Sequence, residues 1–222
     1  MTAPNSNFKS VLASPESFMD FFTLYSKQAA ITGVAIVLLG AGGWFYIQSQ
    51  NLKQERAEKA YFAAQRSLNA GNLPLAESDL KKMVERYDGT TSAKEARLQV
   101  AQILYDQGKY QEGVDYLKPA EDKIGKSKEF GSSVHMVLAG GLEQLKKFKE
   151  AAAEYEKAAE ASRFDSDRER AMSLAARAYL SGADTAKAKS IWTTLGADSK
   201  GTVAGEARVR LGELTSKAEP QS

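Results

Sequence analysis

The hydrophobic and polar positions divide the chain into one long apolar run and a series of amphipathic segments. The apolar run, AAITGVAIVLLGAGGWFYI, covers residues 29–47, and no charged residue occurs between Lys27 and Lys53. A helix of this length is about 28 Å long, close to the ~30 Å hydrocarbon core of a bilayer. Its last residues include the triplet Trp-Phe-Tyr, and such rings favour the level of the lipid headgroups. The pattern therefore predicts one transmembrane helix over 29–47.

Two other interpretations of the run are weaker. A cleaved signal peptide has a short basic start and a small-residue cleavage site, whereas here a long segment precedes the run and aromatic residues end it. A buried helix of a soluble core is the second alternative. It would normally carry a polar stripe, and this run is apolar on all sides.

The segment before the run, residues 1–28, is predicted to be a short tail that ends in an aromatic helix. Residues 1–13 are polar and unpatterned, which is typical of disorder. Ser-Pro-Glu at 14–16 combines an N-cap, a proline and an acid in the order of a helix start. Four aromatic side chains then share one helix face: Phe18, Phe21, Phe22 and Tyr25. We expect an interfacial helix here, with a docking face for a membrane partner as the alternative.

Small residues within the apolar run fall on one side of the predicted helix. Ala29, Gly33 and Gly40 could let another membrane helix approach closely, although glycine is common in such helices anyway. No proline or glycine occurs from Trp44 to Ala70, so residues 48–54 are predicted to form a helical linker. We therefore expect the membrane helix to continue without a break into the next domain.

Residues 55–216 are predicted to form an all-α domain, because amphipathic segments alternate with turn signals and no segment has strand periodicity. Pro119 should kink or end its helix early. The tail 217–222 is predicted to be disordered. Helices are expected near 50–70, 74–87, 92–107, 111–123, 129–146, 149–162, 167–181, 185–195 and 202–216.

Small residues recur at a nearly fixed period through this domain. Four of them lie 37, 38 and 37 residues apart: Ala76, Gly113, Ala151 and Ala188. A large apolar residue follows each by four positions: Leu80, Leu117, Tyr155 and Trp192. Another small residue precedes each by twelve: Ala64, Ala101, Ala139 and Ala176. One helix pair cannot bury its own apolar face, so this repetition predicts stacked helix pairs that share a continuous core.

The repeat resembles the tetratricopeptide repeat, whose turn motif is G-x-Y-x-x-A. Gly108, Tyr110 and Gly113 fit it nearly in full, and the other three units fit in part. The resemblance implies an α-solenoid of about four helix pairs, capped by the helix at 202–216. It also implies that the first helix of each pair lines a concave, protein-binding groove. The inward candidates are Tyr61, Gln65, Asn69, Leu98, Gln102, Tyr105, Asp106, Met136, Glu143 and Arg177. The alternative is that Tyr61, Leu98 and Met136 belong to the core between repeats.

Composition and motifs point away from catalysis. The chain has 30 Lys and Arg against 28 Asp and Glu, and no dense basic block that would favour nucleic acid. The absence of cysteine excludes thiol catalysis and thiolate metal sites. The single histidine, His135, falls in a predicted helix and is expected at a core or boundary position. The acid pair Glu121-Asp122 is expected on a solvated helix face. We predict no enzyme, cofactor, metal site or small-molecule substrate.

The whole arrangement resembles the YfgM family, an ancillary subunit of the bacterial SecYEG translocon. The matching residues are Phe21-Phe22, Gly43-Trp44-Phe45-Tyr46, Ala60-Tyr61 and the segment 174–192. The resemblance implies a single-pass inner-membrane protein with a cytoplasmic N-terminus and a periplasmic repeat domain. It also implies a role beside SecYEG and a PpiD-like periplasmic chaperone, assisting secreted proteins.

The charges near the run slightly favour the opposite orientation. Lys9 and Lys27 precede it, whereas Lys53, Arg56 and Lys59 follow it, and positive residues tend to stay in the cytoplasm. We prefer the periplasmic orientation because one charge decides little. The alternatives are a cytoplasm-facing adaptor, an adaptor of outer-membrane or cell-wall machinery, and an enzyme with an unrecognised site.

Overall fold

The computed structural model describes the backbone of residues 15–216 and the side chains of residues 30–216. Over that backbone every regular element is a helix, as the sequence predicts. The predictions for residues 1–13 and 217–222 lie outside the described residues, as do those for the side chains of the aromatic face and Ala29. The chain divides into two compact units, Met1–Lys53 and Gln54–Ser222.

Helix α1 runs from Pro15 to Asn69 and passes through residues 48–54 without interruption. The segment from Trp44 to Ala70 lacks proline and glycine, which explains the unbroken hydrogen-bond ladder. Every large apolar side chain from Ile31 to Ile47 is at least 59% exposed. The alternative of a core helix is therefore wrong. Among the described residues, this is the one helix long and apolar enough to cross a membrane.

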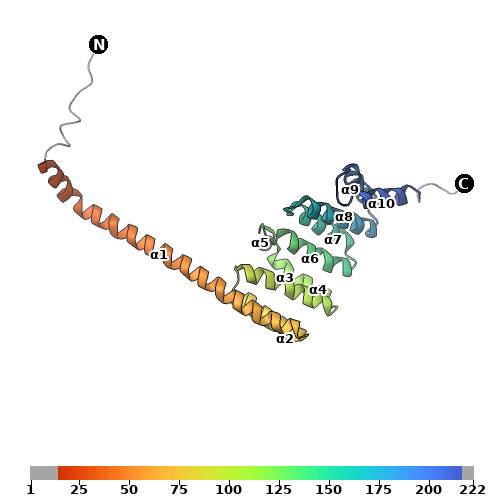
Figure 1. Ribbon diagram of the computed structural model, residues 1–222, viewed down its shortest axis with the longest axis horizontal. Coiled ribbons are helices and arrows are strands. Elements are labelled where there is room, and N and C mark those ends of the chain that lie inside the picture. The colour runs from red at the N-terminus through yellow and green to blue at the C-terminus, as the bar shows by residue number, and fades with distance from the viewer. Residues whose placement is uncertain (1–14, 217–222) are drawn as a thin grey trace, which may run out of the picture. The chain divides into compact units, whose positions relative to one another are not determined.

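The second unit is a stack of antiparallel helix pairs, seen from α2 to α10 in Figure 1. The end of α1 packs with α2 and α3 in one buried cluster, and α3 with α4, α6 with α7 and α8 with α9 form the later pairs. Helix α10 packs on α9, at the position predicted for the capping helix. The bounds are α2 Leu73–Arg86, α3 Thr91–Asp106, α4 Tyr110–Leu117, the 3₁₀ helix η2 Lys118–Ala120, α5 Glu121–Gly125, α6 Gly131–Gln144, α7 Phe148–Glu160, α8 Asp165–Ser181, α9 Thr185–Ala197 and α10 Ala204–Ser216.

The segment predicted as one helix over 111–123 is instead three short elements, α4, η2 and α5. Pro119 lies within η2. Proline has no backbone N–H and clashes with the carbonyl four residues earlier, so α4 ends at Leu117. The early end that the sequence predicts is confirmed, and the chain turns there before α5 begins.

The periodic small residues are the points where helices meet. All of those identified from the sequence are buried, and each alanine among them has no exposed surface. The large residues four positions later are buried as well, with Trp192 1% and Tyr155 4% exposed. The small side chains let helix backbones approach, and the large ones fill the space to the next pair. The predicted repeat is thus confirmed in the packing.

The turns inside the pairs share one backbone conformation. Gly71, Gly108, Lys146 and Ala183 have φ of 75°, 75°, 58° and 62°, at equivalent places in successive pairs. Glycine adopts this left-handed conformation without a steric cost, whereas lysine and alanine do not. The last two pairs therefore keep the turn geometry without the glycine of the family motif.

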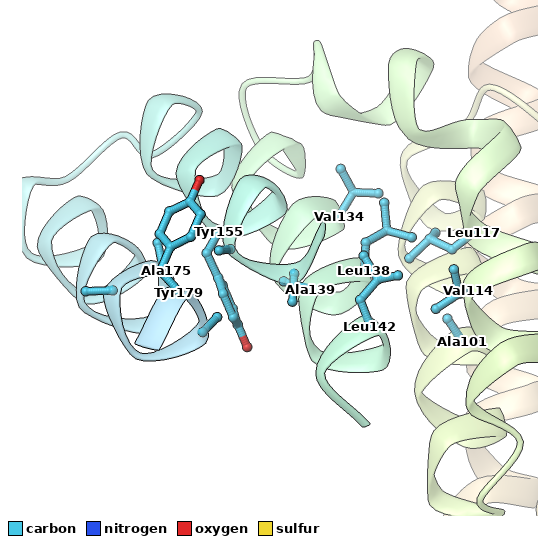
Figure 2. Packing of buried hydrophobic residues seen from close by; sticks show 14 of the residues in the cluster. Ala101, Val114, Leu117, Val134, Leu138, Ala139, Leu142, Tyr155, Ala175 and Tyr179 are labelled. Atoms are coloured by element: carbon cyan, nitrogen blue, oxygen red, sulfur yellow. The ribbon is translucent and has the colours of Figure 1, made fainter. Parts of the chain in front are cut away.

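One continuous core runs through the later pairs, and Figure 2 shows its centre. Val134, Leu138 and Leu142 project from α6 toward Val114 and Leu117 of α4. Because these side chains are fully or almost fully buried, they fix α6 against the preceding pair. The surface of α6 that carries Met136 and Val137 is only half-buried.

Candidate protein-binding groove

Helices α3 and α6, the first helices of neighbouring pairs, enclose a hollow of about 380 Å³. Four residues predicted from the sequence line it: Gln102, Tyr105, Asp106 and Met136. The sequence analysis missed four others: Tyr110, Val137, Gly140 and Gln144. Gly140 and Gln144 lie four and eight positions after Met136, so helical periodicity around that residue could have identified them, whereas Val137, one position after it, could not be found in this way.

Tyr105 forms the wall of this hollow, and two glycines make room for it. A Cβ atom on Gly113 would overlap the ring, and one on Gly141 would overlap the hydroxyl group. The hydroxyl is buried and has no hydrogen-bond partner among the described residues. Burial raises the pKa of Tyr105 to about 12, so the side chain is neutral at physiological pH. Tyr105 thus acts as a rigid apolar surface.

Three other predicted residues lie near the end of α1. The Gln65 amide donates to the Tyr61 hydroxyl at 2.7 Å and to Gln99 Oε1 at 2.8 Å, which links α1 to α3. Burial, together with a hydrogen bond to Glu95, raises the pKa of Tyr61 to about 12. Asn69 is exposed at the last residue of α1. None of the three lines the hollow between α3 and α6.

The remaining predicted residues make internal contacts. Leu98 packs against the core, which is the alternative considered for it. Glu143 accepts a hydrogen bond from the Tyr155 hydroxyl at 2.7 Å, and Arg177 Nε donates to Glu206 of α10 at 2.9 Å. The structure therefore brings together the α3 and early α6 candidates, whereas Gln65, Glu143 and Arg177 join helices.

A second hollow, of about 470 Å³, lies between the start of α6, the end of α7 and the start of α8. Met136 and Val137 line both hollows, so the two hollows adjoin with these side chains between them. Together the two hollows are called the groove. Phe164 is 62% exposed at this end. Sequence analysis missed this half because Phe164 lies in a turn, outside the helical pattern.

A charge network lies on another side of α6. It consists of three buried residues, Glu121, His135 and Glu154, and two half-exposed lysines, Lys118 and Lys157. His135 Nδ1 is 2.8 Å from Glu154 Oε2. Lys118 Nζ lies 2.8 Å from Glu154 and 2.6 Å from Glu121. Lys157 Nζ lies 2.7 Å from Glu121 and 3.0 Å from Glu154. The network thus ties η2 and α5 to α6 and α7.

The predicted burial of His135 is confirmed, but the prediction of a solvated Glu121 is wrong. After the chain turns at Pro119, Glu121 lies against α7 and is covered, while Asp122 stays exposed. Burial alone would raise the pKa of Glu154, but hydrogen bonds from His135, Lys118 and Lys157 outweigh it and hold that pKa at about 2.

Three side chains of this network, Glu121, His135 and Glu154, are of the types that can bind a metal cation. Ligand atoms of Glu121, His135 and Glu154 lie within 4.8 Å of one another. Both carboxylates already accept hydrogen bonds from lysine ammonium groups, so a metal ion would have to displace Lys118 and Lys157. The arrangement fits a structural ion network better than a metal centre.

Comparisons with known proteins agree with the helical stack. The family described as "Tetratricopeptide repeat-like domain" matches residues 20–189. No curated protein matches the chain. Tetratricopeptide-like repeats of a Podosopora anserina putative kinesin light chain share 17% identity over 74% of this chain and 88% of that one, with a TM-score of 0.58. BtubC (BKLC) from P. vanneervenii shares 17% identity over 78% and 82%, with a TM-score of 0.55. At such identities the likeness shows the fold alone.

Proposed function

The chain belongs to the family of tetratricopeptide repeat-like domains, and on that premise we propose that it is a membrane-anchored scaffold that binds partner proteins through the groove. The observation that carries the proposal is the groove itself, in which exposed polar side chains and half-buried apolar ones from the first helices of neighbouring pairs lie together. The fold is typical of non-enzymatic interaction scaffolds, and the proposal includes no catalytic step.

Residues 29–47 are proposed as the anchor, with 1–28 as the cytoplasmic tail, 48–54 as the linker, 55–216 as the repeat domain and 217–222 as a terminal tail. The exposed apolar surface of α1 supports this assignment. The side with Ala29, Gly33 and Gly40 would contact another membrane helix. A Cβ atom added to Gly33 or Gly40 would meet no neighbour within 4 Å, which leaves space for that helix.

We place the repeats in the periplasm of the bacterial inner membrane, beside SecYEG and a PpiD-like chaperone, where they assist secreted proteins. The support is the sequence resemblance to the YfgM family. The second candidate, a cytoplasm-facing adaptor, is favoured by the extra positive charge after the apolar run. An adaptor of outer-membrane or cell-wall machinery would share the fold and differ only in its partners.

Topology separates the first two candidates. The chain lacks cysteine, so Lys126→Cys, at an exposed position after α5, creates a single thiol. A membrane-impermeant maleimide should label it in intact cells with a permeabilised outer membrane. Labelling only after lysis would place the repeats in the cytoplasm and refute the periplasmic assignment.

Partner identity needs a second experiment. After cross-linking and detergent extraction, the proposal predicts co-purification with SecYEG or with a periplasmic chaperone. Recovery of outer-membrane or cell-wall proteins instead would favour the other envelope adaptor. Recovery of neither group would remove the translocon role while leaving the anchored scaffold to be tested by binding.

A further inference from the structure

The first helix pair of the stack, residues 54–69 of α1 together with α2, has an outer face at one end of the domain (Figure 1). Ala63 on this outer face is exposed. Val100 and Leu138 occupy the same place in the next two pairs, after steps of 37 and 38 residues, and neither has any exposed surface. Because each of them is covered by the pair before it, the outer face has the position of a junction between pairs.

The second helix of the first pair leads to the same conclusion. Asp79 of α2 corresponds to Glu154 of α7, two pairs later, which binds Lys118 at the end of the preceding pair at 2.8 Å. Lys82 corresponds to Lys157, which binds an acid of that preceding pair at 2.7 Å. Asp79 and Lys82 themselves form no ion pair with any residue that the structure describes. The first pair thus carries an acid and a base of the kind that join later pairs, without a pair for them to join.

A hollow of about 350 Å³ lies between the two helices on the outer face. Ala60 and Ala63 line it along α1, and the buried Met83 lines it along α2. Leu75, one helical turn before Asp79, adds an apolar side chain that is 46% exposed. Small side chains let a second helix approach closely, as the periodic alanines do inside the stack. The hollow therefore has the shape of a trough for one more helix.

The charges around this hollow are mainly positive. Lys82 and Arg86 line it on α2, and Arg56 lies on the same side of α1, seven positions before Ala63. None of the three cations forms an ion pair within the described part of the chain, and Asp79 is the one acid among the lining residues. Three unpaired cations against one acid favour a negatively charged partner.

A second copy of this chain does not match the charge of the outer face. Two copies related by a two-fold axis would bring the same patch of each together, so the cations of one would face those of the other. Like charges in contact oppose association. The far end of the stack does not supply an open pair either, since α10 packs on α9 there. An acidic helix of another protein matches both the shape and the charge.

We propose that the outer face binds an acidic amphipathic helix of a partner protein, in the position that a preceding pair would occupy. Its small or apolar stripe would lie on Ala60 and Ala63, and its carboxylates would lie toward Arg56, Lys82 and Arg86. The outer face shares no lining residue with the groove, so this inference goes beyond the proposed function and does not depend on it. Because the cations are exposed, affinity falls as ionic strength rises.

The test is selection from a phage-displayed library of amphipathic helices against the full chain in detergent micelles. The library keeps a stripe of alanine and leucine and varies the flanking positions among glutamate, lysine and glutamine. Helices with glutamate flanks should be enriched. As synthetic peptides they should bind roughly tenfold more weakly to Lys82→Glu/Arg86→Glu, since their acids would then face like charges. The matched control, Lys149→Glu/Lys189→Glu, changes two exposed lysines away from the outer face and should leave affinity unchanged.

A further variant distinguishes the outer face from the groove. Arg163→Glu/Arg170→Glu changes groove residues only and should leave the affinity of the selected helices unchanged. If it weakens binding while Lys82→Glu/Arg86→Glu does not, the helices occupy the groove, which would overturn this inference and keep the proposed function. Enrichment of lysine-flanked helices, or of no helix, would also overturn it. Far-UV circular dichroism and thermal unfolding of each variant verify that the fold is intact.

Binding of a second copy is tested directly with Ala63→Cys, because the chain has no cysteine of its own. Mild oxidation of the detergent-solubilised variant should give no disulfide-linked dimer, since the two cationic faces repel each other. Efficient formation of that dimer would show that the outer face binds itself and would overturn the acidic partner.

Discussion

His135 and Met136 are neighbours in α6, yet they belong to regions with opposite uses of charge. His135 joins a network in which each carboxylate is bound by ammonium groups and screened from water. Met136 lines a groove whose cations Arg163 and Arg170 form no ion pair among the described residues. Charges that are paired and buried hold helix pairs together, whereas charges left unpaired beside an apolar surface are available to a partner.

Removing a buried charge of the network should have the largest effect on stability. Glu154→Ala should lower the free energy of unfolding by about 1–3 kcal/mol, because it removes the nearest acceptor of the buried His135 and one of the two carboxylates that bind each lysine. Urea unfolding followed by far-UV circular dichroism measures this. Glu160→Ala, at an exposed position of the same helix, should change stability by no more than about 0.5 kcal/mol. Similar small effects of both changes would contradict a structural role for the network.

Two adjacent glycines of α6 provide a closely matched pair. Gly141→Ala should destabilise by about 1–3 kcal/mol, since its methyl group would overlap Tyr105 and press on Val114. Gly140→Ala meets nothing within 4 Å and should stabilise the helix by about 0.5–1 kcal/mol. Thermal unfolding of the two variants tests the prediction. Two shifts of the same sign would show that Tyr105 is not held as described.

Lowering the pH should reduce the contribution that the charge network makes to the free energy of unfolding. The pKa of Glu154 is held at about 2 in the folded chain, below the ordinary value of 4.5 that the unfolded chain regains. A carboxyl group whose pKa is lowered by folding stabilises the fold above its unfolded pKa and loses that contribution as pH falls. From pH 7 to pH 3 the loss should be about 2 kcal/mol. Urea midpoints across this range should fall less for Glu154→Gln, and an equal fall would contradict the assignment.

Removing the groove charges should have the smallest effect on stability. Arg163→Ala/Arg170→Ala deletes two exposed side chains that form no ion pair among the described residues, so the free energy of unfolding should stay within about 0.5 kcal/mol of the parent. Urea unfolding gives the value directly. A loss comparable to that of Glu154→Ala would mean that the arginines hold the fold together, and the distinction between the two sides of α6 would fail.

The sequence was sufficient to predict features that recur along the chain. The alanines at fixed spacing, from Ala64 to Ala188, identify helix contacts because each repeat needs the same close approach. Features that depend on a single departure from the repeat could not be predicted. Glu121 resembles a solvated acid in sequence, and it is buried because the chain turns at Pro119 and brings it against Lys157 of α7, which lies 36 residues later.

The two halves of the groove illustrate the same limit. Tyr105 and Met136 could be proposed from their positions in the first helices of their repeats. Lys128, Arg163 and Phe164 lie in or next to the connections between helices, where no periodicity places a side chain. Their contribution depends on how α6 and α8 are stacked, which emerges only in three dimensions.

The most direct test of the account is site-specific photo-cross-linking in living cells. A photoreactive residue at Gln144 lies in the groove, and one at Glu112 lies on an exposed position of α4 outside it. The account predicts a discrete protein adduct from position 144 that disappears with Arg163→Glu/Arg170→Glu, and none from position 112. Adducts from position 112 alone, or an adduct at 144 that survives the charge reversal, would contradict the claim that this groove binds the partner.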